Sequence, residues 1–436
     1  MANGTLNIKF KCSNPFLNNP MEEIKERLQQ FWDLPVSIKA MYYLLFLTFG
    51  NTIFQYIRPI NNAAGVSEST DFIFTILWII GIYFSLSLVF KSLRLIDIVF
   101  YFALCSFYYL SPTIYPRTRF FVENTFSIFA LQTLPYYFLA LMIDFNRDKT
   151  ALIIISKLQI IMTAFFVLLS LLRLINTDVT GEQMDRSYSI LFPTMFLYYT
   201  YSKSKQNKDL YFFLLGLSLI LMFGTRGPLL CLIIYLFAFL ILNNTYNAVM
   251  TINLLLGMIA VYIFLRPIML LLMFLTRLVG LSTRIFESFL EDELFNYEKS
   301  SGRDEIHELL WNRIINDGGG IGYGLGSDRL LGRNGTEYAH NFVYEVWMDF
   351  GLYIGTFLLA LFAFFIGVVF KKAFGSDRFN LFLILLVWSV GHLMISGSYL
   401  HDFQVYFFIG YCVNILRSDN QEESEDNVII CISEDN

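Results

Sequence analysis

Charged residues are scarce in this chain of 436 residues. Asp, Glu, Lys and Arg together make up 15% of it, whereas a soluble domain carries about 25%. Hydrophobic residues make up 56%, and the mean hydropathy is +0.54. The 31 basic residues do not outnumber the 36 acidic ones, so there is no basic excess to hold nucleic acid. The sequence therefore predicts a polytopic membrane protein that binds no nucleic acid.

Several catalytic and structural signatures are also absent. The five Cys are scattered, and none lies in the long polar segment 276–339, which argues against a disulfide framework or a zinc site. No Asp-x-Asp pair occurs, so we expect no metal-held nucleotide-sugar donor. No Gly-x-Ser-x-Gly elbow occurs either. The first apolar run begins only after Pro35, so no cleavable signal peptide is expected. We therefore expect neither a metal nor a cofactor.

The apolar runs predict an all-α membrane protein with about twelve transmembrane helices, because about 20 apolar residues cross the hydrocarbon core. The predicted spans are 37–57, 72–90, 95–112, 121–143, 151–173, 187–202, 209–224, 227–243, 248–275, 341–370, 379–397 and 401–416. The resulting divisions are a cytoplasmic segment with an interfacial helix (1–36), nine spans (37–275), a large external loop (276–339), three spans (340–416) and an acidic cytoplasmic tail (417–436).

Basic residues differ in type between the two sides of this topology. With a cytoplasmic N-terminus, ten basic residues fall in the short inner loops and six in the short outer loops, as the positive-inside rule requires. All six outer residues are Arg: Arg58, Arg117, Arg119, Arg173, Arg186 and Arg226. Arg favours bidentate recognition of carboxylate or phosphate, although the insertion rule alone also keeps Lys out of these loops. Arg226 lies beside a helix start, where it could bind an anion or mark a tight turn.

Residues 303–316 predict an amphipathic helix inside the external loop. At about 100° per residue its apolar residues form one stripe, made of Ile306, Leu309, Leu310 and Ile314. The basic residues Arg303, His307 and Arg313 fall on or beside this stripe. Either the helix lies on the membrane surface with snorkelling arginines, or it docks on the membrane domain and directs positive charge at an anionic ligand.

Two further features follow this helix in the sequence. The glycine-rich segment 318–326 could offer backbone N–H groups to a phosphate, or it could simply be flexible. At helical spacing His340, Tyr344 and Trp347 then share one face, and Asn341, Glu345 and Asp349 share another. Because His340 lies where the external loop returns to the membrane, it suits a general base or a phosphate ligand. The alternative is a satisfied polar residue at a membrane interface.

The order of these motifs resembles that of the O-antigen polymerase and O-antigen ligase superfamily. The motifs are Thr225-Arg226-Gly227, Gly302-Arg303 with Trp311 downstream, Gly322-x-Gly324, and His340-Asn341 with Gly351 after them. The resemblance spans about 220–356 by motif and the whole chain by hydropathy. The spacing between Arg303 and Trp311 is long, and the glycines after His340 are spaced loosely for a ligase, so polymerase and ligase both stay open.

The resemblance implies a metal-independent glycosyltransferase at the outer face of the bacterial cytoplasmic membrane. Such an enzyme would join undecaprenyl-diphosphate-linked oligosaccharides, serving as donor and acceptor, into O-antigen, capsule or exopolysaccharide. Membrane lipid and a chain-length regulator are the other expected partners. A ligase that transfers the glycan to a final acceptor is the alternative within this reaction class. A flippase for lipid-linked oligosaccharides is the alternative from another class, but it should show two similar halves.

The predicted site residues divide into two groups. The catalytic candidates are His340, Arg226 and Arg303, and the substrate-binding candidates are Arg186, Arg313, Asn341, His307 and Tyr344. The leaving diphosphate gains charge as the glycosidic bond breaks, and guanidinium groups would stabilise that charge through bidentate hydrogen bonds. A docked loop helix would bring Arg226 and Arg303 onto one diphosphate.

Overall fold

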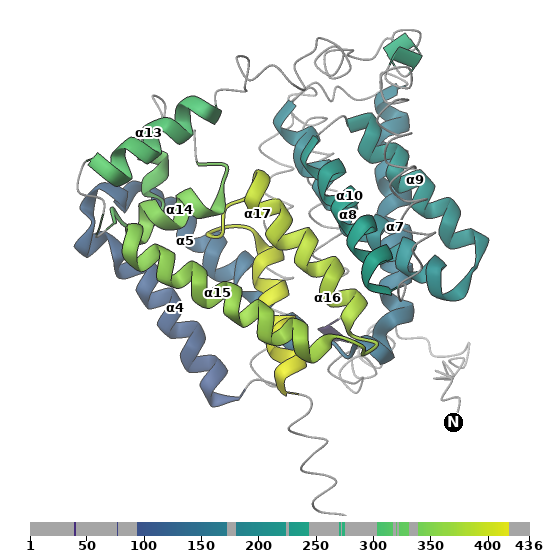
Figure 1. Cartoon of the computed structure of the whole chain (residues 1–436), viewed down its shortest axis with the longest axis horizontal. Coiled ribbons are helices and arrows are strands. Elements are labelled where there is room, and N and C mark those ends of the chain that lie inside the picture. Colours follow the sequence, from purple (N-terminus) through teal and green to yellow (C-terminus); the bar gives the residue numbers. More distant parts are fainter. Residues whose placement is uncertain are drawn as a thin grey trace, which may run out of the picture.

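The computed structural model describes residues 39–40, 76, 94–171, 180–223, 226–243, 270–271, 273–274, 303–316, 320, 322–330 and 339–417. Every regular element within these residues is a helix, and none is a strand (Figure 1). The predicted spans 37–57, 72–90 and 248–275 fall almost wholly outside the described residues, as do most of the predicted external loop and both terminal segments.

The first half of the described chain forms a series of helices. Its elements are α4 (Leu95–Ile114), η1 (Pro116–Thr118), α5 (Arg119–Ile128), η2 (Phe129–Thr133), α6 (Pro135–Met142), α7 (Phe145–Leu171), α8 (Thr180–Ser204), α9 (Asn207–Phe223) and α10 (Arg226–Asn243). Pro116 ends the α4 region because it starts the short helix η1 at a position where proline needs no N–H partner.

The second half contains short helices followed by longer apolar helical segments. Its elements are α13 (Arg303–Asn316), η4 (Ser327–Leu330), α14 (Phe342–Phe350), α15 (Leu352–Ala373), α16 (Phe379–Leu386), η5 (Val387–Gly391) and α17 (His392–Ile395). A last helix covers 403–417, and the segment 396–402 joins it to α17.

The predicted span 341–370 is wrong as a single helix, because the chain breaks at Gly351. This glycine has φ 82°, and a Cβ there would collide with the carbonyl group of Gly320. Its N–H still donates to the Trp347 carbonyl oxygen at 2.8 Å, which closes α14. Because α14 and α15 are both apolar, their patterns merge in the sequence. The apolar helix of membrane-spanning length therefore begins only at Leu352, and α14 lies outside it.

Within the described part of the chain, four helical segments are long and apolar enough to cross a membrane: Leu95–Ile114, Pro116–Met142, Asp148–Leu169 and Leu352–Ala373. Gly227–Leu242 and Phe379–Ile395 are shorter apolar helices. On α15 the side chains of Tyr353, Phe357 and Phe364 are exposed. Water would penalise such apolar surface by about 25 cal/mol per Å², whereas lipid would not. The architecture is that of a helical membrane protein.

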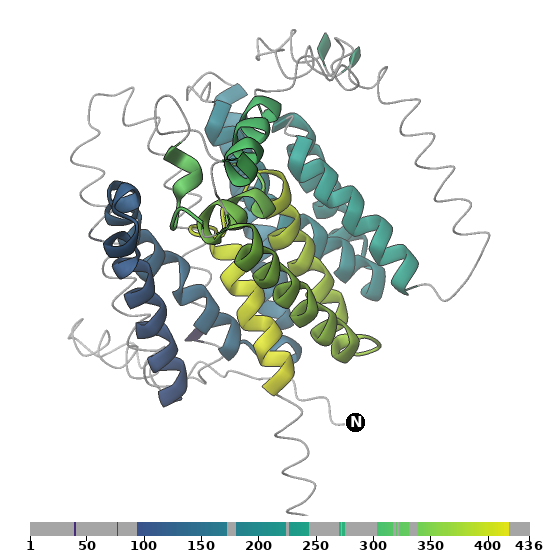
Figure 2. The same ribbon diagram turned by 60° about the vertical axis from the view of Figure 1, so that its left-hand side comes forward.

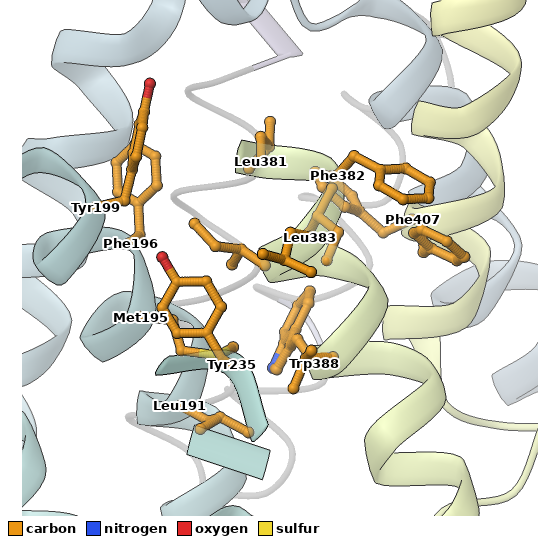
Figure 3. Packing of buried hydrophobic residues seen from close by; sticks show 14 of the residues in the cluster. Leu191, Met195, Phe196, Tyr199, Tyr235, Leu381, Phe382, Leu383, Trp388 and Phe407 are labelled. Atoms are coloured by element: carbon orange, nitrogen blue, oxygen red, sulfur yellow. The ribbon is translucent and has the colours of Figure 1, made fainter. Parts of the chain in front are cut away.

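One extended cluster of buried aromatic and aliphatic side chains packs α8 and α10 against α16 and the last helix. Figure 3 shows Leu191, Met195, Phe196 and Tyr199 of α8 and Tyr235 of α10 facing α16, Trp388 and Phe407. Trp388 also donates through its indole N–H to the Tyr188 carbonyl oxygen at 3.4 Å. This cluster ties the first half of the chain to the last three helical segments.

The two ends of the helix bundle differ in character. At one end Arg417 forms an ion pair with Asp97 at 2.7 Å, and Lys372 donates to the Leu416 carbonyl oxygen at 3.1 Å. The opposite end carries α13, α14 and the segment 396–402 (Figures 1 and 2). The inner-loop basic residues that the structure describes gather at the first end, and most candidate site residues gather at the second.

Candidate functional site

The helix predicted over 303–316 is present as α13, and it docks on α14. Leu310 and Ile314 are buried in a cluster with Ala339 and Met348. Leu309, which the sequence placed in the same stripe, is 57% exposed, so that part of the prediction is wrong. The stripe is narrower because only the residues facing Ala339 and Met348 find a partner.

His307 and Tyr344, two predicted substrate-binding residues, lie together at this contact. Their rings stack with centroids 4.8 Å apart. The His307 Nε2 lies 2.9 Å from the Ala339 carbonyl oxygen, which can only accept a hydrogen bond, so this nitrogen carries the proton. The two side chains therefore hold α13 against the start of α14.

His340 lies before the helix that was predicted to contain it. Its backbone has φ 50°, and α14 begins at Phe342 after the N-cap residue Asn341. The Asn341 Oδ1 accepts from the Val343 N–H at 2.9 Å, so this predicted substrate ligand caps a helix. The prediction that His340 shares a helical face with Tyr344 is wrong, because the turn at His340 takes it off the helix.

The glycine-rich segment packs against the end of α14. Tyr323 N–H donates to the Met348 carbonyl oxygen at 2.8 Å, and Gly324 N–H donates to that of Asp349 at 3.1 Å. Gly322 has φ 83°, and a Cβ there would lie 2.5 Å from the Asp349 carbonyl oxygen. In the described part of this segment the N–H groups of Tyr323 and Gly324 already have backbone acceptors, and Gly322 allows a close backbone approach.

Three buried carboxyl groups connect α14 with its neighbours. The Asp349 Oδ1 accepts from Ser327 N–H at 3.1 Å, and its Oδ2 accepts from the Tyr399 hydroxyl at 2.6 Å. Glu345 accepts from the Ser398 hydroxyl and from Tyr399 N–H. The third group, on Asp328, accepts from Ala339 N–H at 2.9 Å. We call Asp328, Glu345 and Asp349 the carboxyl cluster.

The carboxyl cluster binds protons more tightly than exposed acids do. Burial raises the pKa of Asp349 to about 8, and the nearby Asp328 adds to the rise. Burial likewise raises the pKa of Glu345 well above its usual range, with further contributions from Asp328 and Asp349. Carboxyl groups with raised pKa values and buried hydrogen bonds suit a structural clamp between α14, η4 and the segment 396–402.

A pocket of about 240 Å³ lies between η1 and α13 and contains two Arg residues. Arg117 comes from η1 and Arg313 from α13. The Arg313 guanidinium lies over the Tyr323 ring, 5.3 Å from its centroid, and the Tyr323 hydroxyl donates to the Arg313 carbonyl oxygen at 3.2 Å. Among the described residues that line it, none is acidic. This pocket, the Arg117–Arg313 pocket, suits an anion.

A larger cavity of about 410 Å³ lies between α7, α8, α17 and the last helix. Its polar lining residues are Gln132, Ser156, Gln159, Asp185, Ser189, His392, His401, Asp402 and Gln404. The His392 Nδ1 lies 3.6 Å from the Asp402 Oδ2, and the His392 ring lies 3.8 Å from that of Tyr188. The described lining includes neither Lys nor Arg.

The remaining predicted cations lie at helix starts or close to the cavity. Arg226 and Arg303 are the first residues of α10 and α13, and their side chains lie outside the described residues. The next residue, Gly227, packs so closely on the Tyr188 hydroxyl that a Cβ would collide with it. The start of α10 therefore adjoins the cavity wall.

Arg186 is buried in α8 next to Asp185, but it does not line the cavity.

Sequence reasoning missed the segment 396–402 as part of the site. Ser398 and Tyr399 hold the carboxyl cluster, while His401 and Asp402 line the cavity. A usable signal was present, because this short run of polar residues interrupts two apolar segments near the predicted outer face.

No protein-family model, curated protein sequence or solved structure matches this chain. Its function has to be inferred from its residues and their arrangement.

Proposed function

We propose that this chain is a glycosyltransferase of the bacterial cytoplasmic membrane that joins undecaprenyl-diphosphate-linked oligosaccharides into a polysaccharide. In this proposal about twelve helices span the membrane, and the end carrying α13 and α14 faces outward. The observation that carries the proposal is the Arg117–Arg313 pocket, which lies at the same end as the polar cavity. A transferase for lipid-diphosphate donors needs such an anion site beside room for sugar.

In this reaction the two guanidinium groups would stabilise the charge of the leaving diphosphate. An acceptor hydroxyl attacks the anomeric carbon, and the bond from that carbon to the diphosphate oxygen breaks. The electron pair leaves with the diphosphate, whose growing charge Arg117 and Arg313 would stabilise by bidentate hydrogen bonds. Losing one such donor typically costs about 3–4 kcal/mol of transition-state stabilisation.

The hydroxyl proton needs an acceptor in the same reaction. His340 keeps this role in the proposal, because its turn before α14 lies beside α13 through the contact of His307 with Ala339. Arg226 and Arg303 are proposed as further cations for the diphosphate. The basic residues at the opposite end support a cytoplasmic assignment for that end.

Mass spectrometry of lipid-linked saccharides in cells lacking the protein tests this function. A polymerase predicts accumulation of single lipid-linked repeat units. Accumulated long chains would indicate a ligase instead, and units trapped in the cytoplasm would indicate a flippase. Either result would contradict the proposal.

Complementation with variants then tests the pocket. Arg313→Gln and Arg117→Gln should each reduce polymer formation on the order of a hundredfold or more. Arg119→Gln is the matched control, because Arg119 lies two residues from Arg117 but pairs with Glu123 at 2.7 Å. Equal polymer formation in all three variants would remove the pocket from the mechanism.

A further inference from the structure

The larger cavity is unsuited to a diphosphate because of its charge. Asp185 and Asp402 line it, and no cation does so among its described lining residues. An anion inside would lie near the carboxyl groups of Asp185 and Asp402, whose negative charge disfavours its binding. The occupant of this cavity should therefore be uncharged or positive.

Two buried polar atoms in the cavity wall lack hydrogen-bond partners. They are the Ser156 Oγ and the Gln404 Oε1, which come from α7 and the last helix and line the same cavity. Buried polar atoms in proteins almost always have a partner. The Gln404 oxygen can only accept, whereas the Ser156 hydroxyl can also donate. A ligand with several hydroxyl groups can donate a hydrogen bond to the Gln404 oxygen and exchange one with the Ser156 hydroxyl.

Aromatic side chains also line this cavity. Tyr136, Tyr188, Trp388 and Phe403 all contribute to the cavity wall. The rings of Tyr136 and Phe403 lie 4.3 Å apart, and Trp388 lies 5.7 Å from Phe403. Flat apolar faces with a few placed polar groups are typical of small-molecule sites. A sugar ring has both a C–H face for the aromatic walls and hydroxyl groups for the unpartnered atoms.

We propose that this cavity binds an uncharged sugar ring, while the diphosphate of a lipid-linked substrate stays outside it in the Arg117–Arg313 pocket. The choice of a saccharide over other uncharged polyhydroxylated ligands rests on the proposed function. The two sites are linked through one chain of contacts: Ser327 lines the Arg117–Arg313 pocket and donates to Asp349. Asp349 in turn holds Tyr399, two residues before His401 of the cavity wall.

Saturation-transfer NMR on the purified full chain in lipid nanodiscs tests this site. The probes are glucose, galactose, rhamnose and N-acetylglucosamine as neutral sugars, with glucuronate and inorganic pyrophosphate as anions. At least one neutral sugar should bind, and the anions should not compete with it. Ser156→Ala and Gln404→Leu should each weaken that binding by about three- to tenfold, the usual value of one hydrogen bond.

Thermal unfolding of the same variants separates binding from folding. Removing an unpartnered buried polar atom should leave the unfolding temperature of the ligand-free protein unchanged or raised, which a purely structural role would not give. Ser218→Ala and Gln206→Leu are matched controls, because both residues are exposed and outside the cavity. They should leave sugar binding unchanged.

Two results would overturn the inference. One is that no neutral sugar binds, which would show that the cavity is not a sugar site. The other is neutral-sugar binding of equal strength in wild type, Ser156→Ala and Gln404→Leu. Because this readout involves no glycosyl transfer, failure of the proposed polymerase activity in cells would leave it intact.

Discussion

Asp349→Asn is expected to change how the stability of the protein depends on pH. Asp349 is 2% exposed, and its oxygens accept from Ser327 and Tyr399. Burial, together with the nearby Asp328, raises its pKa from 3.8 to about 8. Asn has nearly the same shape but never ionises. Its Oδ1 can still accept from Ser327 and its Nδ2 can donate to the Tyr399 hydroxyl oxygen, so the substitution removes the titration and keeps hydrogen bonds to both neighbours.

The direction of this pH dependence follows from proton binding by Asp349 in the folded and in the unfolded chain. Below pH 4 both the folded and the unfolded chain hold the Asp349 proton. Between pH 4 and 8 the unfolded chain has lost it and the folded chain keeps it, so stability falls as pH rises. The pKa difference from 3.8 to pH 7, at about 1.4 kcal/mol per unit, gives roughly 4 kcal/mol. For a chain of this size that corresponds to a shift on the order of 5 °C in unfolding temperature.

Tryptophan fluorescence during heating, recorded from pH 4 to pH 9 in one detergent, measures this dependence. The unfolding temperature of the wild type should fall towards pH 8, and that of Asp349→Asn should fall by about 5 °C less. Glu123→Gln is the control, since Glu123 is an exposed acid near the same end of the bundle and pairs with Arg119. The same pH dependence of the unfolding temperature in wild type and Asp349→Asn would show that the folded protein does not raise the pKa of Asp349.

Three further predictions concern docking, backbone approach and topology. Leu310→Ala should cost about 2–5 kcal/mol of packing and speed hydrogen exchange in α13, whereas Leu309→Ala, at an exposed position of the same helix, should not. Gly322→Ala should lower the unfolding temperature, because its φ of 83° and the 2.5 Å approach to a backbone carbonyl of α14 exclude a Cβ; an unchanged temperature would contradict this contact. In a Cys-free background, Asn312→Cys should react with an impermeant maleimide in intact cells and Ser376→Cys should not, and the reverse pattern would invert the proposed orientation.

Helix positions could be predicted well where one face or one run is apolar. The pattern over 303–316 gave the bounds that α13 has, because Leu310 and Ile314 repeat at helical spacing. The break at Gly351 could not be predicted, because both flanking helices are apolar. Its reason lies in the close approach of Gly320, about thirty residues earlier in the chain.

The candidate site was predictable only for residues that one helix holds together. The shared face of Glu345 and Asp349 follows from four-residue spacing, and both are buried in α14. Their partners Ser398 and Tyr399 lie about fifty residues later. No local sequence pattern predicts that contact. The same holds for the contact between η1 and α13, which brings two guanidinium groups to one pocket.

The end of the bundle that carries α14 holds both acids and arginines, and the protonation of Asp349 affects the net charge there. Asp349 lies beside Ser327, which also lines the Arg117–Arg313 pocket. At neutral pH the raised pKa of Asp349 keeps this carboxyl group uncharged, so it does not offset the positive charge of the two guanidinium groups. Above pH 8 the carboxylate would ionise and oppose an anion in the pocket. Burial of the carboxyl cluster therefore does more than clamp three segments, because it lets an anion site share its wall with an acid.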